Sequence, residues 1–306
     1  MDKTFAMLIG WVWLGTLAAC RPGEGTDLPP VSPSPPTLSP TSTVVPTPTP
    51  TITPTPAPTP TKEVSAVTFT VVYDNNPYDP ALQTAWGFAC WVETPQGVVL
   101  FDTGGDGPTL LGNLARLGLD PRAVDVVVLS HAHGDHTGGL RGLLDAGDHP
   151  IVYVPSAFPD AFKEAVRART DLVEVVGPME VLPGIHTTGP VGSSIVEQAL
   201  VVETDEGIVV VTGCAHPGVV EMVRCAKEVA GEGVALLMGG FHLSRASRSR
   251  IEAIIGDLRS LGVQRVAPCH CTGDLARRMF AEAFGNDFFP AGVGWRIALE
   301  GAGGGH

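Results

Sequence analysis

One segment of six residues constrains this chain more than any other feature: His131-Ala132-His133-Gly134-Asp135-His136. It directly follows the apolar run Val126–Leu129, which predicts a buried strand. Alternate side chains of an extended segment share a face, so His131 and His133 can bind one metal ion. After the turn that glycine permits, Asp135 and His136 face a second position. Imidazole and carboxylate are ordinary ligands of divalent ions, so the segment predicts a two-metal site.

This segment resembles the hallmark of the metallo-β-lactamase superfamily, His-x-His-x-Asp-His after a strand. The resemblance covers about residues 65–300. It implies two divalent metal ions, with zinc preferred and manganese or iron as alternatives. Later motifs are similar to one branch, the metal-dependent hydrolases often labelled dihydropterin-ribofuranosyl-aminobenzene-phosphate synthase. These motifs are Phe101-Asp102-Thr103-Gly104, Gly213-Cys214-Ala215-His216-Pro217-Gly218, Gly239-Gly240-Phe241-His242-Leu243 and Pro268-Cys269-His270-Cys271-Thr272-Gly273.

The remaining metal ligands are expected at strand ends, because rigid elements hold ligands to metal geometry. His216 and His270 each follow a predicted strand within a few residues. His186 competes with His216, which is preferred because the surrounding Gly-Cys-x-His-x-Gly motif matches the branch. Cys214 looks like the superfamily residue that bridges or flanks the metals, and metal would stabilise its thiolate. A buried, inert thiol is the alternative for Cys214.

Two further residues are expected to act in the site. In the superfamily the aspartate at the position of Asp102 orients the metal loop without binding metal, and such outer groups fix imidazole tautomers. His242 ends a predicted strand, and three roles remain open for it: ligand, substrate-binding group or proton donor. Asp135 is expected both to bind one metal and to orient the nucleophilic water.

Substrate contacts are predicted at two places. Glu197 belongs to a Glu-Gln pair that resembles a branch motif facing the substrate. Thr272 precedes the predicted helix 274–284, whose free backbone N–H groups could hold a phosphate or carboxylate. Cys269 and Cys271 flank His270, so on an extended backbone they face away from it and are expected to be packing residues.

The N-terminus reads as a targeting segment. Lys3 precedes the short apolar stretch Phe5–Ala19, which has the length of a signal-peptide core. Leu17-Ala18-Ala19-Cys20 resembles a bacterial lipobox, in which the cysteine becomes the lipidated first residue. We therefore predict a lipoprotein signal peptide at 1–19 and a membrane anchor at Cys20 on the outer face of a bacterial membrane. Ordinary secretion and an uncleaved anchor are the alternatives.

Composition divides the rest of the chain into a tether and a domain. Residues 20–62 hold 14 of the 28 prolines, mixed with threonine and serine, and favour a disordered, extended tether. Residues 63–306 fit one large domain, and the formal net charge of −13 falls on them. Nucleic acid is excluded as a partner, since phosphates need neutralisation by Lys and Arg. A small-molecule substrate remains.

The apolar pattern of the domain favours an α/β fold. Strands come first and then alternate with helices, which suits an αββα four-layer sandwich, and the resemblance implies the same fold. The strands are predicted at 67–73, 88–94, 98–102, 126–129, 151–154, 172–176, 199–203, 208–212, 235–238 and 263–267. The helices are predicted at 109–117, 140–146, 160–168, 219–230, 249–261 and 274–284.

The expected activity is hydrolysis of a small ester, phosphoester or amide outside the cytoplasm, because two adjacent divalent ions activate water and polarise the bond under attack. A serine hydrolase is disfavoured, since residues 63–306 contain no Gly-x-Ser-x-Gly motif. A synthase such as the branch label names and a non-catalytic surface lipoprotein are the alternatives. An iron redox protein of the same fold is disfavoured by His133, where those proteins usually have Glu.

Overall fold

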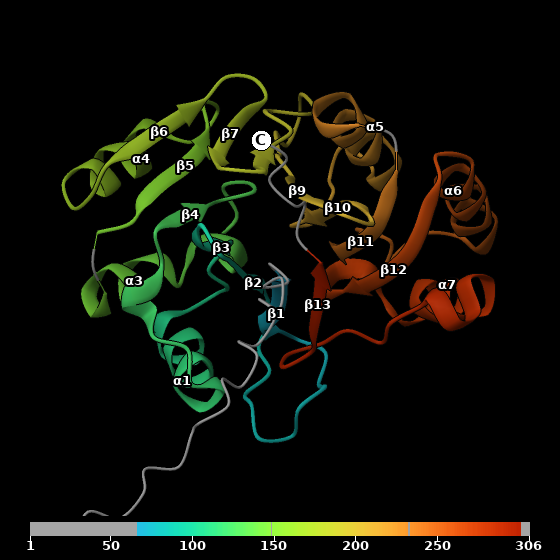
Figure 1. Ribbon diagram of the computed structural model, residues 1–306, viewed down its shortest axis with the longest axis horizontal. Helices are drawn as coiled ribbons and strands as arrows, with labels where there is room; N and C mark the ends of the chain where they lie inside the picture. The colour runs from blue at the N-terminus through green and yellow to red at the C-terminus, as the bar shows by residue number, and fades with distance from the viewer. Residues whose placement is uncertain (1–65, 148, 232, 301–306) are drawn as a thin grey trace, which may run out of the picture. The chain divides into compact units, whose positions relative to one another are not determined.

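Two β-sheets lie face to face and carry helices on their outer sides (Figure 1). The structure, a computed structural model, describes residues 66–147, 149–231 and 233–300. The chain divides into Met1–Thr59 and Pro60–His306, and every described residue belongs to the second unit. The predicted signal peptide (1–19), Cys20 and the tether (20–62) lie outside the described residues, so these assignments stay predictions.

The first sheet has seven strands in the order β13-β1-β2-β3-β4-β5-β6. The neighbours β3, β4, β5 and β6 run parallel, whereas β13, β1, β2 and β3 pair antiparallel. The interior strand β4 consists of three buried valines, as a strand covered on both faces requires. The bounds are β1 (Ala66–Asp74), β2 (Phe88–Thr94), β3 (Gly97–Phe101), β4 (Val126–Val128), β5 (Ile151–Pro155), β6 (Leu172–Val175) and β13 (Arg296–Glu300).

The second sheet has six strands in the order β12-β11-β10-β9-β8-β7. Its strands β10, β11 and β12 are parallel neighbours, so their carboxyl ends reach the same edge of the sheet. In open α/β sheets this edge is where ligands bind. The bounds are β7 (Met179–Leu182), β8 (Ile185–Thr187), β9 (Leu200–Thr204), β10 (Gly207–Thr212), β11 (Val234–Gly240) and β12 (Val263–Cys269).

Helix α1 begins and ends at ordinary capping signals. Asp106 accepts a hydrogen bond from the Thr109 backbone N–H at the start of α1, and Gly118 ends this helix in the left-handed conformation. None of the described helices is long and apolar enough to cross a membrane. The bounds are α1 (Gly107–Leu117), α2 (Gly134–Thr137), α3 (Leu140–Ala146), α4 (Asp160–Arg167), α5 (Val219–Ala230), α6 (Arg248–Ser260) and α7 (Asp274–Phe284), with 3-10 turns η1 (Pro121–Ala123), η2 (His270–Thr272) and η3 (Gly285–Asp287).

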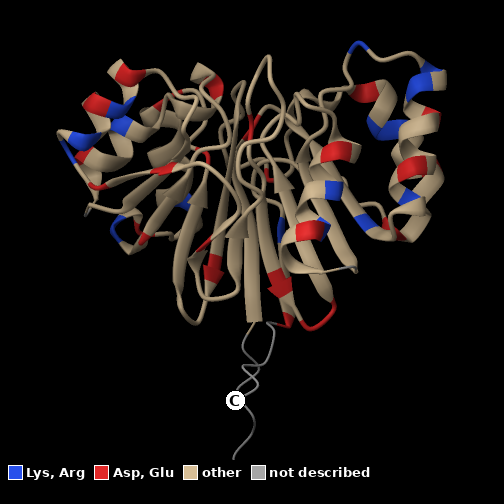
Figure 2. Ribbon diagram, turned by 90° about the horizontal axis from the view of Figure 1, so that it is seen from above, with Lys and Arg blue, Asp and Glu red and all other residues tan. Residues whose placement is uncertain are grey.

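Three apolar clusters hold these layers together. One lies between the sheets and includes Phe69 and Phe101 of the first sheet and Leu236 of the second. A second joins the first sheet to α1, α3 and α4, and a third joins the second sheet to α5, α6 and α7. Acidic and basic residues lie together on the outer helices (Figure 2), whereas the strands β3, β4, β5, β8, β10 and β11 carry none. The predicted αββα sandwich is confirmed.

Every predicted strand and helix is present, with bounds within two residues of those predicted. Three strands, β7, β8 and β13, the single α-helical turn α2 and the 3-10 turns were not predicted. β8 is three residues long, too short for a periodic signal. β13 is an edge strand of five residues that pairs with β1, where Glu300 opposes Ala66. Pairing with a strand so distant in sequence cannot be predicted from the local residue pattern.

Candidate metal centre

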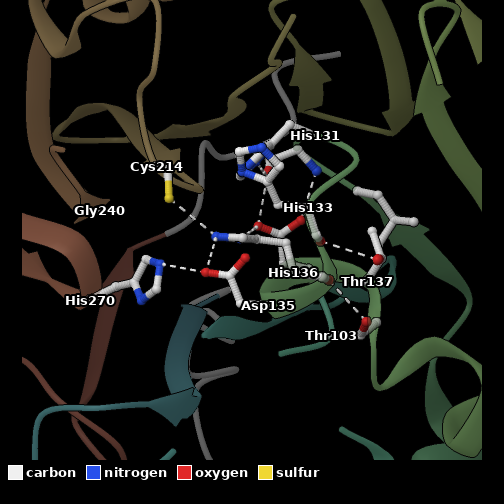
Figure 3. Close-up of polar contacts among 12 residues, drawn as sticks. Thr103, His131, His133, Asp135, His136, Thr137, Cys214, Gly240 and His270 are labelled. Carbon is white, nitrogen blue, oxygen red and sulfur yellow. Dashed lines mark hydrogen bonds and ion pairs between the residues drawn. The ribbon is translucent and has the colours of Figure 1, made fainter. Parts of the chain in front are cut away.

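The segment from His131 to His136 forms a loop and one helical turn at the carboxyl end of β4 (Figure 3). His131 and His133 lie in the loop, and Asp135 and His136 lie on α2. The backbone N–H of His136 donates to the carbonyl of His133 at 3.1 Å, which closes the turn. His131 and His136 are completely buried, so these two imidazoles face inward, whereas His133 is exposed.

The segment supplies ligands to two different sets, each completed by a residue from the second sheet. In each set the three candidate ligand atoms lie within 4.8 Å of one another. Cys214 lies between the sets, because its Sγ is within the same limit of nitrogens of both His131 and His136 and is 3.2 Å from His136 Nε2. The sets are His131, His133 and His216, and Asp135, His136 and His270.

Asp102 orients two of these imidazoles from behind. Its Oδ2 lies 2.7 Å from His136 Nδ1, and its carboxylate accepts hydrogen bonds from both the backbone N–H and the hydroxyl of Ser130. The Ser130 hydroxyl in turn lies 2.9 Å from His131 Nδ1. With Nδ1 engaged, each ring turns Nε2 toward the centre. These contacts match the orienting role expected for Asp102.

His270 is held by the other sheet, a contact that the sequence analysis missed. Its Nδ1 lies 3.0 Å from Asn75 Oδ1, and its backbone N–H donates to Asp74 Oδ2 at 3.0 Å. The pair Asn75–His270 spans 195 residues of sequence, so no local pattern reveals it. The exposed Trp86 ring lies 4.9 Å from the His270 ring, centroid to centroid.

Glu197 has a different place from the expected contact with substrate. It is completely buried, and its carboxylate accepts hydrogen bonds from the backbone N–H groups of Cys214, Ala215 and His216 at 2.8–2.9 Å. Ala215 has φ of 58°, a left-handed conformation that is costly for a residue with a side chain. Glu197 therefore fixes the strained loop that carries Cys214 and His216.

The side chain of Thr272 is also not available to a substrate, whereas anion binding by the backbone N–H groups before α7 stays a prediction. The side chain is completely buried, accepts a hydrogen bond from the Phe241 backbone N–H and donates one to the Cys269 carbonyl. Its hydroxyl therefore ties the turn after β12 to the turn after β11. The sequence predicted the helix start correctly, but the packing of neighbouring turns that uses up the hydroxyl is a tertiary feature.

Burial and neighbouring imidazoles lower the pKa values of two histidines of the first set, His131 and His216. Burial, reinforced by His136 and His216, lowers the pKa of His131 far below its ordinary value. Burial, reinforced by His242, lowers the pKa of His216 to about 4. Burial alone would raise the pKa of Asp135, but contact with His270 and the charge of His136 hold it well below its usual range. At neutral pH His131 and His216 are therefore neutral and Asp135 is ionised, whereas the charge of Asp102 raises the pKa of His136 against the effect of burial.

The residues present fit two divalent metal ions. His216 Nε2 is buried and has no hydrogen-bond partner among the described residues, which is costly unless another partner binds it. Neutral imidazole and carboxylate donors at this spacing suit zinc and related ions. Asp102, Ser130 and Asn75 supply the outer hydrogen bonds that metal-binding histidines have.

Cys271 faces the site, and its prediction as a packing residue was wrong. The prediction assumed an extended backbone, whereas residues 270–272 form the 3-10 turn η2 and His270 has φ of 47°. This turn brings the Cys271 sulfur within 4.8 Å of Cys214 Sγ and a His242 nitrogen. Contact with Cys214 lowers the pKa of Cys271, and the same contact raises that of Cys214. Cys269 is completely buried in the core between the sheets, as expected.

The other histidines lie in distinct places. His216, not His186, joins the metal loop: His186 lies on β8 with Nε2 3.0 Å from Glu203 Oε1. His242 is exposed, and its ring centroid lies 4.3 Å from that of His216. His149 is exposed, as expected.

A cavity of about 610 Å³ opens beside the centre. His216, His242 and Cys271 line it on the side of the candidate ligands, and Trp86, Arg245 and Arg250 line it elsewhere. The arginines were not singled out from the sequence, because an exposed arginine carries no signal until the fold places it. The cavity gives a substrate access to the ligand sets.

Comparison with known proteins agrees with the fold and the motif. Residues 87–223 match the family model described as the metallo-β-lactamase superfamily. A protein of Methanocaldococcus jannaschii named 7,8-dihydropterin-6-methyl-4-(β-D-ribofuranosyl)-aminobenzene-5'-phosphate synthase is 30% identical over 270 residues, which cover 72% of this chain and 92% of that protein. This relative confirms the predicted branch.

Solved structures show the same architecture. A metal-dependent hydrolase of the β-lactamase superfamily superposes with a TM-score of 0.64 and 28% identity, covering 76% of this chain and 98% of the other. The metallo-β-lactamase fold protein YhfI from Bacillus subtilis shares the fold, with a TM-score of 0.58, 15% identity and coverage of 76% and 99%. With the family model, the relative and the ligand sets in agreement, this chain belongs to the metallo-β-lactamase superfamily.

Proposed function

We propose that this protein is a metal-dependent hydrolase that acts on a small ester, phosphoester or amide. The observation that carries the proposal is the pair of three-residue ligand sets placed beside an open cavity. Bound divalent ions, with zinc as the first candidate, supply Lewis acidity: they lower the pKa of water and polarise a carbonyl or phosphoryl group. The 28%-identical structure titled a metal-dependent hydrolase supports this class.

Asp135 is the residue that we assign to the handling of water. Its Oδ2 lies 3.4 Å from His270 Nε2 and 3.7 Å from His136 Nε2, and 23% of its side chain remains exposed. The low pKa keeps this carboxylate ionised at neutral pH. One oxygen can therefore bind metal while the other accepts a hydrogen bond from water and directs the water lone pair at the substrate.

The cavity favours an anionic substrate. Arg245 and Arg250 line it, and neither guanidinium has an ion pair or hydrogen bond among the described residues. Both lie near the N-terminal end of α6, where the helix dipole disfavours positive charge, so a bound anion would relieve this repulsion. Trp86 offers an aromatic surface at the same cavity for an apolar part of the substrate.

Replacement of His131 tests the hydrolase directly. The full chain is assayed with chromogenic esters, phosphodiesters, a lactone and a β-lactam, with and without chelator. His131→Ala should abolish metal retention and turnover, because His131 belongs to two of the candidate groups. His149→Ala replaces an exposed histidine and should change neither. Full activity of a metal-free His131→Ala protein would end the hydrolase proposal.

The synthase is a second candidate, favoured by one observation: the 30%-identical relative bears that name. Detection by mass spectrometry of the aminobenzene phosphate product that the relative is named for would identify a synthase. A non-catalytic surface protein is the third, and metal binding without turnover on any substrate would favour it.

We also propose that the protein is a lipoprotein outside the cytoplasm. The support is the Leu17-Ala18-Ala19-Cys20 sequence after an apolar stretch and before the proline-rich segment. Two or more acyl chains would anchor the chain stably. Cys20→Ala, or an inhibitor of the lipoprotein signal peptidase, should release or mislocalise the protein. Unchanged membrane attachment in both experiments would contradict the anchor.

A further inference from the structure

Three neighbouring parallel strands end in the same way. Cys214 is the second residue after β10, His242 the second after β11, and Cys271 the second after β12. Each turn contains a non-glycine residue with positive φ: Ala215 at 58°, His242 at 52° and His270 at 47°. Such a conformation is unfavourable for a residue with a side chain. The turns at this edge of the sheet thus bring two sulfurs and one imidazole together, and each turn contains a strained residue.

The three donor atoms meet closely enough to share one ion. The sulfurs of Cys214 and Cys271 and a ring nitrogen of His242 lie within 4.8 Å of one another. Both thiols are buried, with 4% and 5% exposure, and the imidazole is exposed at the cavity. Glycine at position 240 makes room for this arrangement, because a Cβ there would lie 2.8 Å from Cys271 Sγ.

We propose that Cys214, His242 and Cys271 form a third metal-binding position, distinct from the two ligand sets of the proposed hydrolase. Cys214 would be shared with the neighbouring pair, since a thiolate sulfur can bridge two ions, whereas His242 and Cys271 belong to this position alone. Two thiolates and an imidazole select a thiophilic ion such as zinc over magnesium, manganese or calcium.

The position has the character of an open site. Three protein donors with the fourth direction free are typical of catalytic zinc, whereas structural zinc sites have four. His242 and Cys271 line the cavity, so the free direction faces the space where a substrate would lie. The ion would therefore be able to hold an anionic or sulfur-containing group of a ligand. Of the three roles open to His242, this assigns that of ligand.

Metal stoichiometry tests the third position without any substrate, so its outcome is independent of the proposed hydrolase activity. The full chain is stripped with chelator, kept reduced with a phosphine, loaded with zinc alone or cadmium alone, dialysed and analysed for bound metal. The wild type should retain three ions per chain, and Cys271→Ser and His242→Ala should each retain two. With cadmium, Cys271→Ser should also lose part of the sulfur-to-cadmium ultraviolet absorption.

Cys269→Ser is the matched control. Cys269 lies two residues from Cys271 but is completely buried in the core between the sheets, so this variant should still retain three ions if it folds. His242→Ala changes an exposed side chain, so it tests the third metal-binding position even if Cys271→Ser fails to fold. A wild type that retains two ions or fewer, or a folded His242→Ala or Cys271→Ser variant that retains as many as the wild type, overturns the proposal.

Discussion

At the scale of single residues, the centre depends on hydrogen bonds made on the far side of each imidazole. Asp102 holds His136 directly and His131 through Ser130, and Asn75 holds His270. Because Nδ1 of each ring is engaged, Nε2 is presented inward before any ion arrives. The rings need little reordering on binding, which favours metal affinity.

His216 and His186 provide a matched pair of replacements. His216→Ala removes a donor from the first ligand set and should weaken metal retention by more than about 100-fold, beyond the 10–100-fold typical of outer hydrogen-bond partners. His186→Ala removes only the contact with Glu203 and should leave metal content unchanged. Metal analysis after dialysis against a competing chelator distinguishes the two. Equal retention by both variants would contradict the assignment of His216.

The lowered pKa of His216 predicts a pH dependence of the metal-free protein. In the unfolded chain a histidine has a pKa of about 6.5, whereas folding lowers that of His216 to about 4. Between these pH values the unfolded state binds more protons than the folded state. The contribution of His216 to the free energy of unfolding is therefore present above pH 6.5 and is lost as the pH falls toward 4. His136, whose pKa Asp102 raises, acts in the opposite direction.

Thermal unfolding of the chelated wild type and of His216→Gln isolates this contribution. Between pH 6.5 and pH 4 the melting temperature of the wild type should decrease more than that of the variant, because glutamine does not titrate. Parallel curves for the two proteins would show that His216 has an ordinary pKa in the folded state.

The sequence indicated which residues the fold brings together in the two candidate ligand sets, but not the contacts around them. The His131–His136 motif and the strand ends indicated every member of the two sets, because ligand identity and spacing are local. Cys271 was wrongly assigned to packing, since the positive φ of His270 reverses the direction that an extended backbone would give. Glu197 was assigned to substrate from a motif resemblance and Thr272 from its place before a predicted helix. Their hydrogen bonds to turns far away in sequence become visible only in the fold.

At the scale of elements, the parallel strands position the chemistry. The turns after β3 and β4 in one sheet and after β10, β11 and β12 in the other carry Asp102, His131, Cys214, His242 and His270. Longer strands and helices with clear periodicity could be predicted from sequence. The short β8 and the edge strand β13 could not, because tertiary pairing rather than local pattern forms them.

Two glycine replacements test how tightly these turns pack. Gly240→Ala places a Cβ 2.3 Å from the Gly213 carbonyl oxygen and 2.8 Å from Cys271 Sγ, and should destabilise the fold by about 1–3 kcal/mol. Gly256→Ala on α6 meets no atom within 4 Å and should stabilise it by about 0.5–1 kcal/mol. Urea unfolding measures both. A Gly240→Ala variant as stable as the wild type would contradict the close packing of the turns.

At the scale of the whole molecule, charge distinguishes the cavity from the rest of the chain. The formal net charge is −13, and charged residues of both signs lie together on the outer helices (Figure 2). Arg245 and Arg250 line the cavity without an ion-pair partner in the described part of the chain. The local field can therefore attract a small anion even though the molecule as a whole repels one.

Arginine replacement tests this preference. For an anionic substrate, Arg245→Ala and Arg250→Ala should each raise KM about three- to fivefold, because an exposed ion pair contributes up to about 1 kcal/mol. The KM for a neutral analogue should not change. Arg248→Ala is the control, because Arg248 lies on the same helix but does not line the cavity. Equal effects on both substrates, or an equal effect of Arg248→Ala, would contradict an anion site.

The most direct test of a metal-dependent hydrolase is the metal content of the purified full chain, measured together with turnover on the substrate panel before and after chelation. The two ligand sets predict at least two divalent ions per chain and hydrolysis that chelation abolishes and added metal restores. A protein that binds no metal, or one whose hydrolysis survives complete removal of metal, would contradict the account.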